Sequence, residues 1–356
     1  SGLIADKLRV NSYRVLWAGL SLISSGLLLL LLDLFFGRYG LLLMAVLVIL
    51  IGQTLQRPHH AVLYGLLYPR GDRRLDRVFV LFYFVINIGS LVGPMLGAAM
   101  FREYGWTGTL CTALAGSCLS WINLLLSRSI WDSASFPLRS EPAESKDLSR
   151  QRRNAILRLT ATMLIFWCSF NLVGSLFHQK LAATRSSGAD LATGNLLVQA
   201  VSSGSITPLF VLVLAPVLML MSFLLQKRGI SLSTPLKIAV GMTLMAAVMI
   251  RVLVGGHGGG SLLTDYFSLT LAELLVVPVS MALTTALSST KTLSSMMGGY
   301  YLVVGIGAWL EIPSSLTDAR TVVVLAAICA VIGLAFGLRR RQWAELSPVP
   351  VPGSGE

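Results

Sequence analysis

The chain has 356 residues, a net charge of +12 at pH 7, 54% hydrophobic residues and only 12% charged residues. Its mean hydropathy of +0.75 lies far outside the range of soluble proteins, which argues against a soluble domain of any kind. We therefore expect an integral membrane protein.

Ten apolar stretches of at least about 17 residues, most of them without any charge, are long enough to cross the hydrocarbon core of a bilayer. In chain order they cover about residues 15–32, 40–56, 78–101, 105–127, 159–177, 206–226, 236–254, 264–286, 293–310 and 320–338. This pattern predicts an all-α polytopic membrane protein with about ten transmembrane helices.

The positive charges gather in alternate loops, which argues against a nucleic-acid-binding surface. Of the 28 Lys and Arg residues, 21 lie in one set of loops and tails: 7–14, 70–77, 128–158, 227–237, 291 and 339–341. The opposite loops hold 6. The positive-inside rule places the richer set in the cytoplasm. We therefore expect both termini in the cytoplasm and the protein in a plasma membrane, most simply the inner membrane of a bacterium.

A polar stretch rich in Ser, Pro and charge divides the apolar helices into two groups. We expect residues 1–127 to form an incomplete N-terminal bundle of four helices, 128–157 a cytoplasmic linker, 158–341 a C-terminal six-helix bundle and 342–356 a disordered tail. Many secondary transporters consist of two six-helix bundles. The opening residues, SGLIADKLRV, resemble the end of a helix and a basic turn. We therefore expect two further helices before Ser1.

Few ionisable residues lie within the apolar stretches or at their edges, and two of them, Arg57 at an edge and Glu273 inside a stretch, have opposite charge. An arginine at membrane depth costs from ~3 to more than 10 kcal/mol, so it usually faces a polar cavity or an acidic partner. These residues indicate a pathway for a solute.

Several motifs follow one another in an order that is typical of one transporter family. They are Gly2-x-x-x-Asp6-Lys7, the stretch from Gly52 to Tyr68, the sequence FYFVINIGS at 82–90, Phe166-Trp167 with Gly174-Ser175, Pro208 with Pro216, Glu273-x-x-x-x-Pro278 and Met296-Met297-Gly298. Together they resemble the proton-dependent oligopeptide transporter family of the major facilitator superfamily, with its first two helices missing. The resemblance covers residues 2 to about 338.

The resemblance implies a secondary active transporter that moves small peptides together with protons and works without a cofactor. Such a protein has a di- or tripeptide or a small anion, protons and the lipid bilayer as partners, not nucleic acid, and we expect a monomer. The chain departs from the family at four positions, where Arg57 replaces a lysine, Asn171 a glutamate, Thr207 an asparagine and Tyr300 a tryptophan.

A peptide is a zwitterion, so its site needs a cation for the carboxylate and an anion for the amine. We expect Arg57 and Glu273 to supply this pair, with Asn87 in the same cavity. Tyr83, Asn171 and Tyr300 are further candidates for substrate binding. As alternatives, Arg57 and Glu273 form a salt bridge that only holds the bundles together, and the two tyrosines are ordinary core residues.

Glu273 is the remaining candidate for proton coupling, because the family's first-helix acids fall in the missing segment and its seventh-helix acid is Asn171. The four cysteines and four histidines show no spacing typical of a metal site. We also find no pattern of an enzyme or of a nucleotide-binding loop. Two other functions stay open: a nitrate or organic-anion carrier of the same fold, and a non-transporting remnant or sensor.

Overall fold

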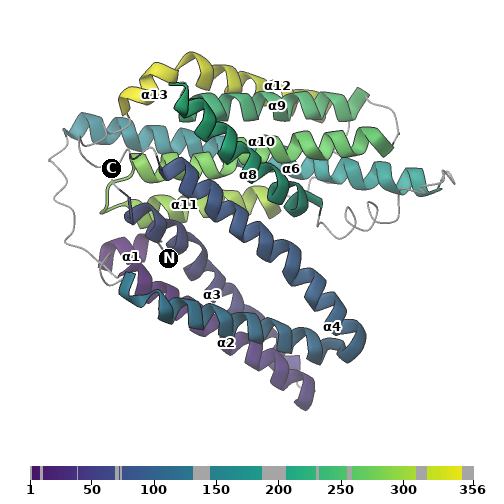
Figure 1. The fold of residues 1–356 in the computed structure, drawn as a ribbon. Coiled ribbons are helices and arrows are strands. Elements are labelled where there is room, and N and C mark those ends of the chain that lie inside the picture. Colours follow the sequence, from purple (N-terminus) through teal and green to yellow (C-terminus); the bar gives the residue numbers. More distant parts are fainter. Residues whose placement is uncertain are drawn as a thin grey trace. The chain divides into compact units, whose positions relative to one another are not determined.

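The computed structural model describes residues 2–8, 11–37, 39–68, 72, 74–130, 145–186, 206–229, 232–254, 259–309 and 319–346. The regular structure of these residues is helical throughout (Figure 1). The helices are α1 (Gly2–Leu8), α2 (Ser12–Phe36), α3 (Tyr39–Leu66), α4 (Leu75–Leu126), α6 (Lys146–Ser186), α8 (Ile206–Lys227), α9 (Thr234–Val254), α10 (Gly259–Leu287), α11 (Leu293–Trp309), α12 (Ala319–Leu338) and α13 (Arg340–Leu346).

Eight of the described helices are long and apolar enough to cross a membrane, and α11 is a shorter apolar helix. Each of the ten stretches expected from the sequence lies on one of these helices, because α4 contains two of them. Many large apolar side chains are exposed along these helices, as expected for surfaces that face lipid. The prediction of an all-α polytopic membrane fold is confirmed.

The long helix α4 is interrupted at Gly105, where the backbone adopts φ 62° and ψ −151°. Such a backbone conformation suits glycine, which has no side chain to clash. After this residue the chain doubles back, since the Thr109 hydroxyl donates to the carbonyl of Gly97 at 3.2 Å. Phe101 and Trp106 pack edge to face at 5.0 Å between ring centres beside the turn.

The described chain divides into two compact units, each drawn from segments that are distant in the sequence. The first unit comprises residues 1–69, 89–146 and 288–301, and the second comprises 70–88, 147–287 and 302–356. The expected division into membrane bundles at 1–127 and 158–341 stays a prediction.

In the first unit, α2 and α3 lie side by side (Figure 1). Their backbones approach closely at two glycines: a Cβ atom added at Gly52 would lie 2.7 Å from the carbonyl oxygen of Gly19. Small residues are typical of such crossings between membrane helices. The second half of α4 joins this pair, because the Tyr13 hydroxyl donates to the carbonyl of Leu124 at 2.7 Å.

Helix α1 also belongs to the first unit and anchors the start of α11. The Asp6 carboxylate accepts a hydrogen bond from the backbone N–H of Ser295 at 2.6 Å. A carboxylate at this position satisfies a free N–H at the start of a helix and complements the positive end of the helix dipole. The sequence Gly2-x-x-x-Asp6 thus has a clear structural role.

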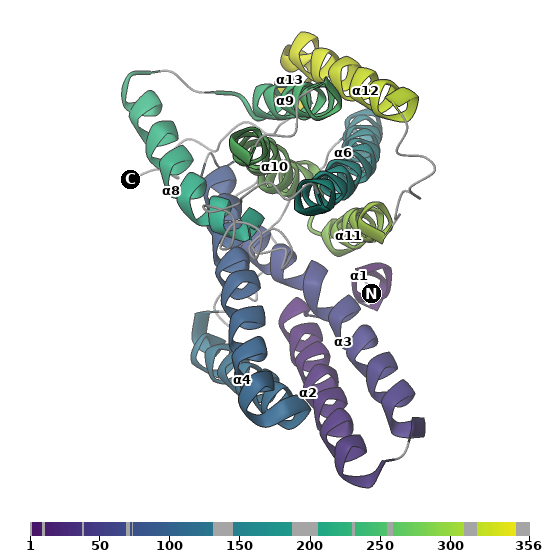
Figure 2. The same cartoon turned by 90° about the vertical axis from the view of Figure 1, so that its right-hand side faces the viewer.

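In the second unit, α9 packs against both α10 and α12 (Figure 2). Three methionines of α9, Met242, Met245 and Met249, are fully buried there. At the far end of α9, the Arg251 guanidinium forms an ion pair with the buried Asp265 of α10 at 2.6 Å. Helix α10 has most of its apolar stretch buried, so it forms the core of this unit.

Two expectations about polar segments differ from the structure. Helix α6 begins at Lys146, inside the segment 128–157 that was expected to be a linker, whereas residues 131–144 lie outside the described part. The segment expected to be a disordered tail, 342–356, begins inside helix α13. Trp343 of that helix is buried and stacks on Phe336 with ring centres 4.9 Å apart. Apolar contacts therefore order both segments where they adjoin the membrane helices.

Candidate functional site

Glu273 lies on α10 in the interior of the second unit and is only 4% exposed. Tyr83 of α4, in the same unit, donates its hydroxyl to Oε1 of Glu273. The second carboxylate oxygen, Oε2, is buried and has no hydrogen-bond partner among the described residues. A buried polar atom without a partner is uncommon in folded proteins and is often associated with function.

The surroundings of this pair are apolar. Leu274, which follows Glu273, belongs to a buried cluster with Val211, Leu214 and Ala215 of α8. Tyr83 packs against the same cluster. A carboxylate in such surroundings carries a penalty of several kcal/mol if it is ionised and unpaired. The site therefore favours either a proton on Glu273 or a cationic group beside it.

Asn87 lies one turn beyond Tyr83 on the same face of α4 and is 7% exposed. Its Nδ2 donates to the carbonyl oxygen of Tyr83 at 2.8 Å. Asn87 thus hydrogen-bonds to the backbone of its own helix, α4, at Tyr83, the residue that contacts Glu273. The structure brings three of the expected site residues together: Tyr83, Asn87 and Glu273.

Arg57 and Tyr300 belong to the first unit. Arg57 is exposed on α3, and its Nε donates to Oε1 of Gln53 at 3.2 Å. Tyr300 itself is 1% exposed and packs edge to face on Tyr301, with ring centres 5.7 Å apart. That Arg57 and Tyr300 face the same solute as Glu273 stays a prediction.

Asn171 has a different partner. Its Nδ2 donates to the carbonyl oxygen of Gly307 at 2.8 Å, which connects α6 to the end of α11 in the second unit. The same stretch of α11 approaches α6 closely, because a Cβ atom added at Gly307 would lie 2.9 Å from Cβ of Trp167. The donor of Asn171 is therefore used for helix packing.

Sequence reasoning missed one polar cluster in the second unit. Asp76 at the start of α4 forms an ion pair with Lys237 of α9 at 2.7 Å and accepts a hydrogen bond from Thr234 at 3.2 Å. A cavity of about 280 Å³ extends from these residues to Val80 and Leu274, near Tyr83 and Glu273 on their helices. Asp76 and Lys237 both lie in the ranges 70–77 and 227–237, which the positive-inside rule assigns to the cytoplasm. This shared side of the membrane was the only sign in the sequence that the two residues could meet.

Known proteins resemble the chain over most of its length. The model of the Major Facilitator Superfamily matches residues 1–310. A peptide transporter of Yersinia enterocolitica is 38% identical over 105 residues, which cover 30% of this chain and 20% of that protein. The dipeptide and tripeptide permease B of Aeromonas hydrophila is 22% identical over 361 residues, covering 80% of this chain and 70% of the permease.

The fold is also that of solved transporters. The crystal structure of a peptide transporter POT in complex with sulfate has a TM-score of 0.60 and 20% identity, and the match covers 97% of this chain and 84% of the other. At this identity the likeness concerns the fold. The chain therefore belongs to the major facilitator superfamily as a multi-pass membrane protein, and it is similar to the peptide transporters of the POT family that its motifs resemble.

Proposed function

We propose that the protein is a secondary active transporter of di- and tripeptides or of similar zwitterionic or anionic solutes. The observation that carries this proposal is the buried carboxylate of Glu273, with one oxygen held by Tyr83 and the other without a partner among the described residues. The names of the Yersinia and Aeromonas relatives support peptides as the solute class.

In this proposal, the free oxygen of Glu273 receives the positively charged amine of the substrate. An ammonium group relieves the penalty of the buried carboxylate, and the Tyr83 hydroxyl keeps the carboxylate oriented towards it. Arg57, the membrane arginine at the end of an apolar stretch, binds the substrate carboxylate in a bidentate manner. Asn87 contributes a further polar group beside Tyr83. Tyr300, which belongs to the same unit as Arg57, contributes a hydroxyl for the carboxylate end of the substrate.

We propose that protons drive this transport through Glu273. A carboxyl group that is buried among apolar side chains exists stably either with a proton or with a bound cation. The proton that Glu273 takes up from outside is displaced by the amine and released to the cytoplasm, so that proton and substrate move in the same direction. The protein would then act as a proton symporter in the inner membrane of a bacterium, with both termini in the cytoplasm.

Uptake of a labelled dipeptide into proteoliposomes tests the proposal. We expect an inward-directed acid gradient to stimulate uptake by the wild-type protein and to have no effect on Glu273→Gln. Glu103→Gln removes an exposed carboxylate near the turn at Gly105 and should retain the stimulation. Unchanged stimulation of Glu273→Gln would overturn the role of Glu273.

A nitrate or organic-anion carrier is the second candidate function. Arg57 makes no ion pair with any described acidic residue, and a guanidinium binds flat oxyanions in a bidentate manner. Uptake of nitrate but not of dipeptide, abolished by Arg57→Gln, would select this function. A correctly folded protein that transports neither solute would be the non-transporting remnant or sensor.

A further inference from the structure

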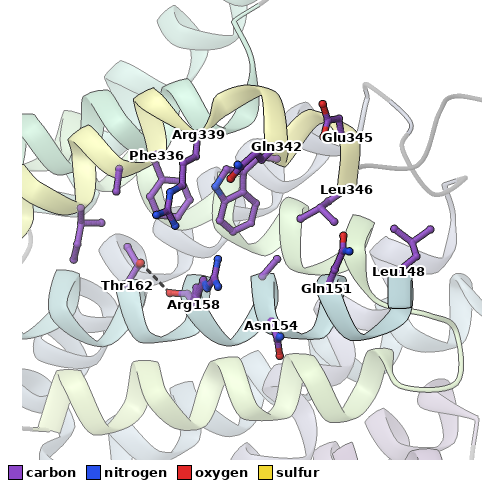
Figure 3. A pocket seen from close by; sticks show the side chains of 14 residues that line it. Leu148, Gln151, Asn154, Arg158, Thr162, Phe336, Arg339, Gln342, Glu345 and Leu346 are labelled. Atoms are coloured by element: carbon purple, nitrogen blue, oxygen red, sulfur yellow. Dashed lines mark hydrogen bonds between the residues drawn. The ribbon is translucent and has the colours of Figure 1, made fainter. Parts of the chain in front are cut away.

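A second cavity of about 530 Å³ lies within the second unit, between the first turns of α6 and the junction of α12 and α13 (Figure 3). Gln151 and Arg158 line it from α6, and Arg339, Gln342 and Trp343 line it from the opposite side. It is separate from Glu273, which does not contribute to its walls.

Two arginines face this cavity from opposite walls. Figure 3 shows Arg158 extending from α6 towards the side on which Arg339 extends from the end of α12. Neither guanidinium makes an ion pair with an acidic residue in the described part of the chain. The acid that lines the cavity, Glu345, has its carboxylate turned away from the two arginines in Figure 3. The cavity therefore has an excess of positive charge.

The walls are held by contacts that do not involve these two guanidinium groups. Trp343 is 8% exposed and stacks on Phe336 with an angle of 16° between the rings. Arg152 of α6 is buried, and its Nε donates to the carbonyl oxygen of Leu346 at the end of α13 at 2.9 Å. Helix α13 is thus held over the start of α6, and the shape of the cavity does not depend on the two guanidinium groups.

The two arginines also stand at the ends of apolar stretches. Arg158 directly precedes the stretch 159–177, and Arg339 directly follows 320–338. Their neighbours Leu157 and Leu338 are apolar and exposed, Leu338 by 83%. Because the apolar stretches are long enough to span a bilayer, we expect guanidinium groups at their ends to lie at the level of the lipid headgroups and the exposed leucines to lie where the acyl chains begin. Tryptophan is also typical of this interface.

We propose that this cavity binds the phosphate group of an anionic phospholipid. The phosphate lies between Arg158 and Arg339, each of which can donate two parallel hydrogen bonds to its oxygens. The amides of Gln151 and Gln342 line the same cavity and are available to headgroup hydroxyls. Basic pockets at the cytoplasmic ends of membrane helices are suited to such headgroups. The bound lipid would join α6 to the α12–α13 junction.

Binding of phosphatidylglycerol to the purified full chain in detergent, measured by native mass spectrometry, tests this proposal. We expect the double variant Arg158→Gln with Arg339→Gln to retain phosphatidylglycerol at least about tenfold less well than wild type, because charge-assisted hydrogen bonds are lost. The matched control is Arg153→Gln with Arg341→Gln. It removes the same charge from exposed residues of α6 and α13 that do not line the cavity.

Two further arms identify the source of the phosphate. Phosphatidylcholine should bind equally weakly to all variants, and inorganic phosphate should displace little phosphatidylglycerol. Binding of inorganic phosphate alone, with the same dependence on Arg158 and Arg339, would assign the cavity to a soluble phosphate. Equal retention of phosphatidylglycerol by the pocket variant and its control would overturn the proposal.

A lysine variant separates binding from folding. Arg158→Lys with Arg339→Lys keeps both charges but loses bidentate contact, so we expect retention between those of wild type and the glutamine variant. The helical circular dichroism of every variant should match wild type. If the lysine variant retained no more lipid than the glutamine variant while both were folded, the positive charge of the pocket would not be the cause of lipid binding.

Discussion

At the scale of single residues, the carboxyl group of Glu273 is the group in the described part of the second unit whose burial has the clearest consequence for function. It is buried, its protein partner is one tyrosine hydroxyl, and that tyrosine packs against a cluster of leucine, valine and alanine side chains. The sequence pointed to Glu273 and Asn87, because polar groups in apolar stretches are few. It could not show the pairing with Tyr83, since the two residues are 190 positions apart and a membrane tyrosine packs equally well in a core.

Tyr83→Phe removes this single hydroxyl and keeps the ring. We expect the unfolding free energy in detergent to fall by about 1–3 kcal/mol, because a buried acceptor loses its donor. Dipeptide uptake should also fall, because the carboxylate is no longer oriented. Thermal unfolding and proteoliposome uptake measure the two effects.

Tyr104→Phe serves as the control, because Tyr104 is 68% exposed and its hydroxyl is accessible to solvent or headgroups. It should behave as wild type in both measurements. If Tyr83→Phe were as stable and as active as Tyr104→Phe, the hydrogen bond to Glu273 would have no role in the site.

At the scale of elements, the sequence predicted the apolar helices well, and it failed where helices are polar. The stretch 146–157 is rich in charge, yet Arg152, Ala155, Ile156 and Leu159 are buried in the helix that it begins. These positions follow the spacing i, i+3, i+4 and i+7 of one helix face. Composition suggested a linker there, because a narrow buried stripe changes the average hydropathy of a segment very little.

The crossing of α2 and α3 gives a prediction for elements. Gly52→Ala should lower the unfolding free energy by about 1–3 kcal/mol, since the new methyl group has to displace the backbone of α2 or the side chain of Ile23. A Cβ atom there would lie 2.7 Å from the Gly19 carbonyl oxygen and 2.8 Å from Cγ1 of Ile23.

Gly93→Ala is the matched control, because a Cβ atom at this helical position meets nothing within 4 Å. Alanine has the higher helix propensity by about 1 kcal/mol, so this variant should be neutral or slightly more stable. Chemical denaturation in detergent compares the two. Equal effects of both substitutions would show that the close approach of α2 and α3 does not contribute to stability.

At the scale of the whole molecule, the family and the number of apolar helices could be predicted from the sequence, whereas the joint site could not. Motifs and hydropathy are local properties, and they can be recognised in one sequence without an alignment of relatives. A solute site formed by Arg57 and Glu273 depends on how the segments that carry them meet, which is a long-range property. The charges of the loops, by contrast, predict the orientation of the whole chain in the membrane.

This orientation can be tested with single cysteines in a chain from which Cys111, Cys118, Cys168 and Cys329 have been removed. We expect Arg102→Cys to react with a membrane-impermeant maleimide in intact cells, and Arg153→Cys to react only after the membrane has been opened. The reason is that 21 of the 28 basic residues lie in the loops on the side of Arg153 and only 6 in those on the side of Arg102. Positively charged loops are retained in the cytoplasm. Labelling of Arg153→Cys in intact cells would reverse the orientation. It would also move the pocket of Arg158 and Arg339 to the outer leaflet, where the choice of anionic lipid would have to be tested again.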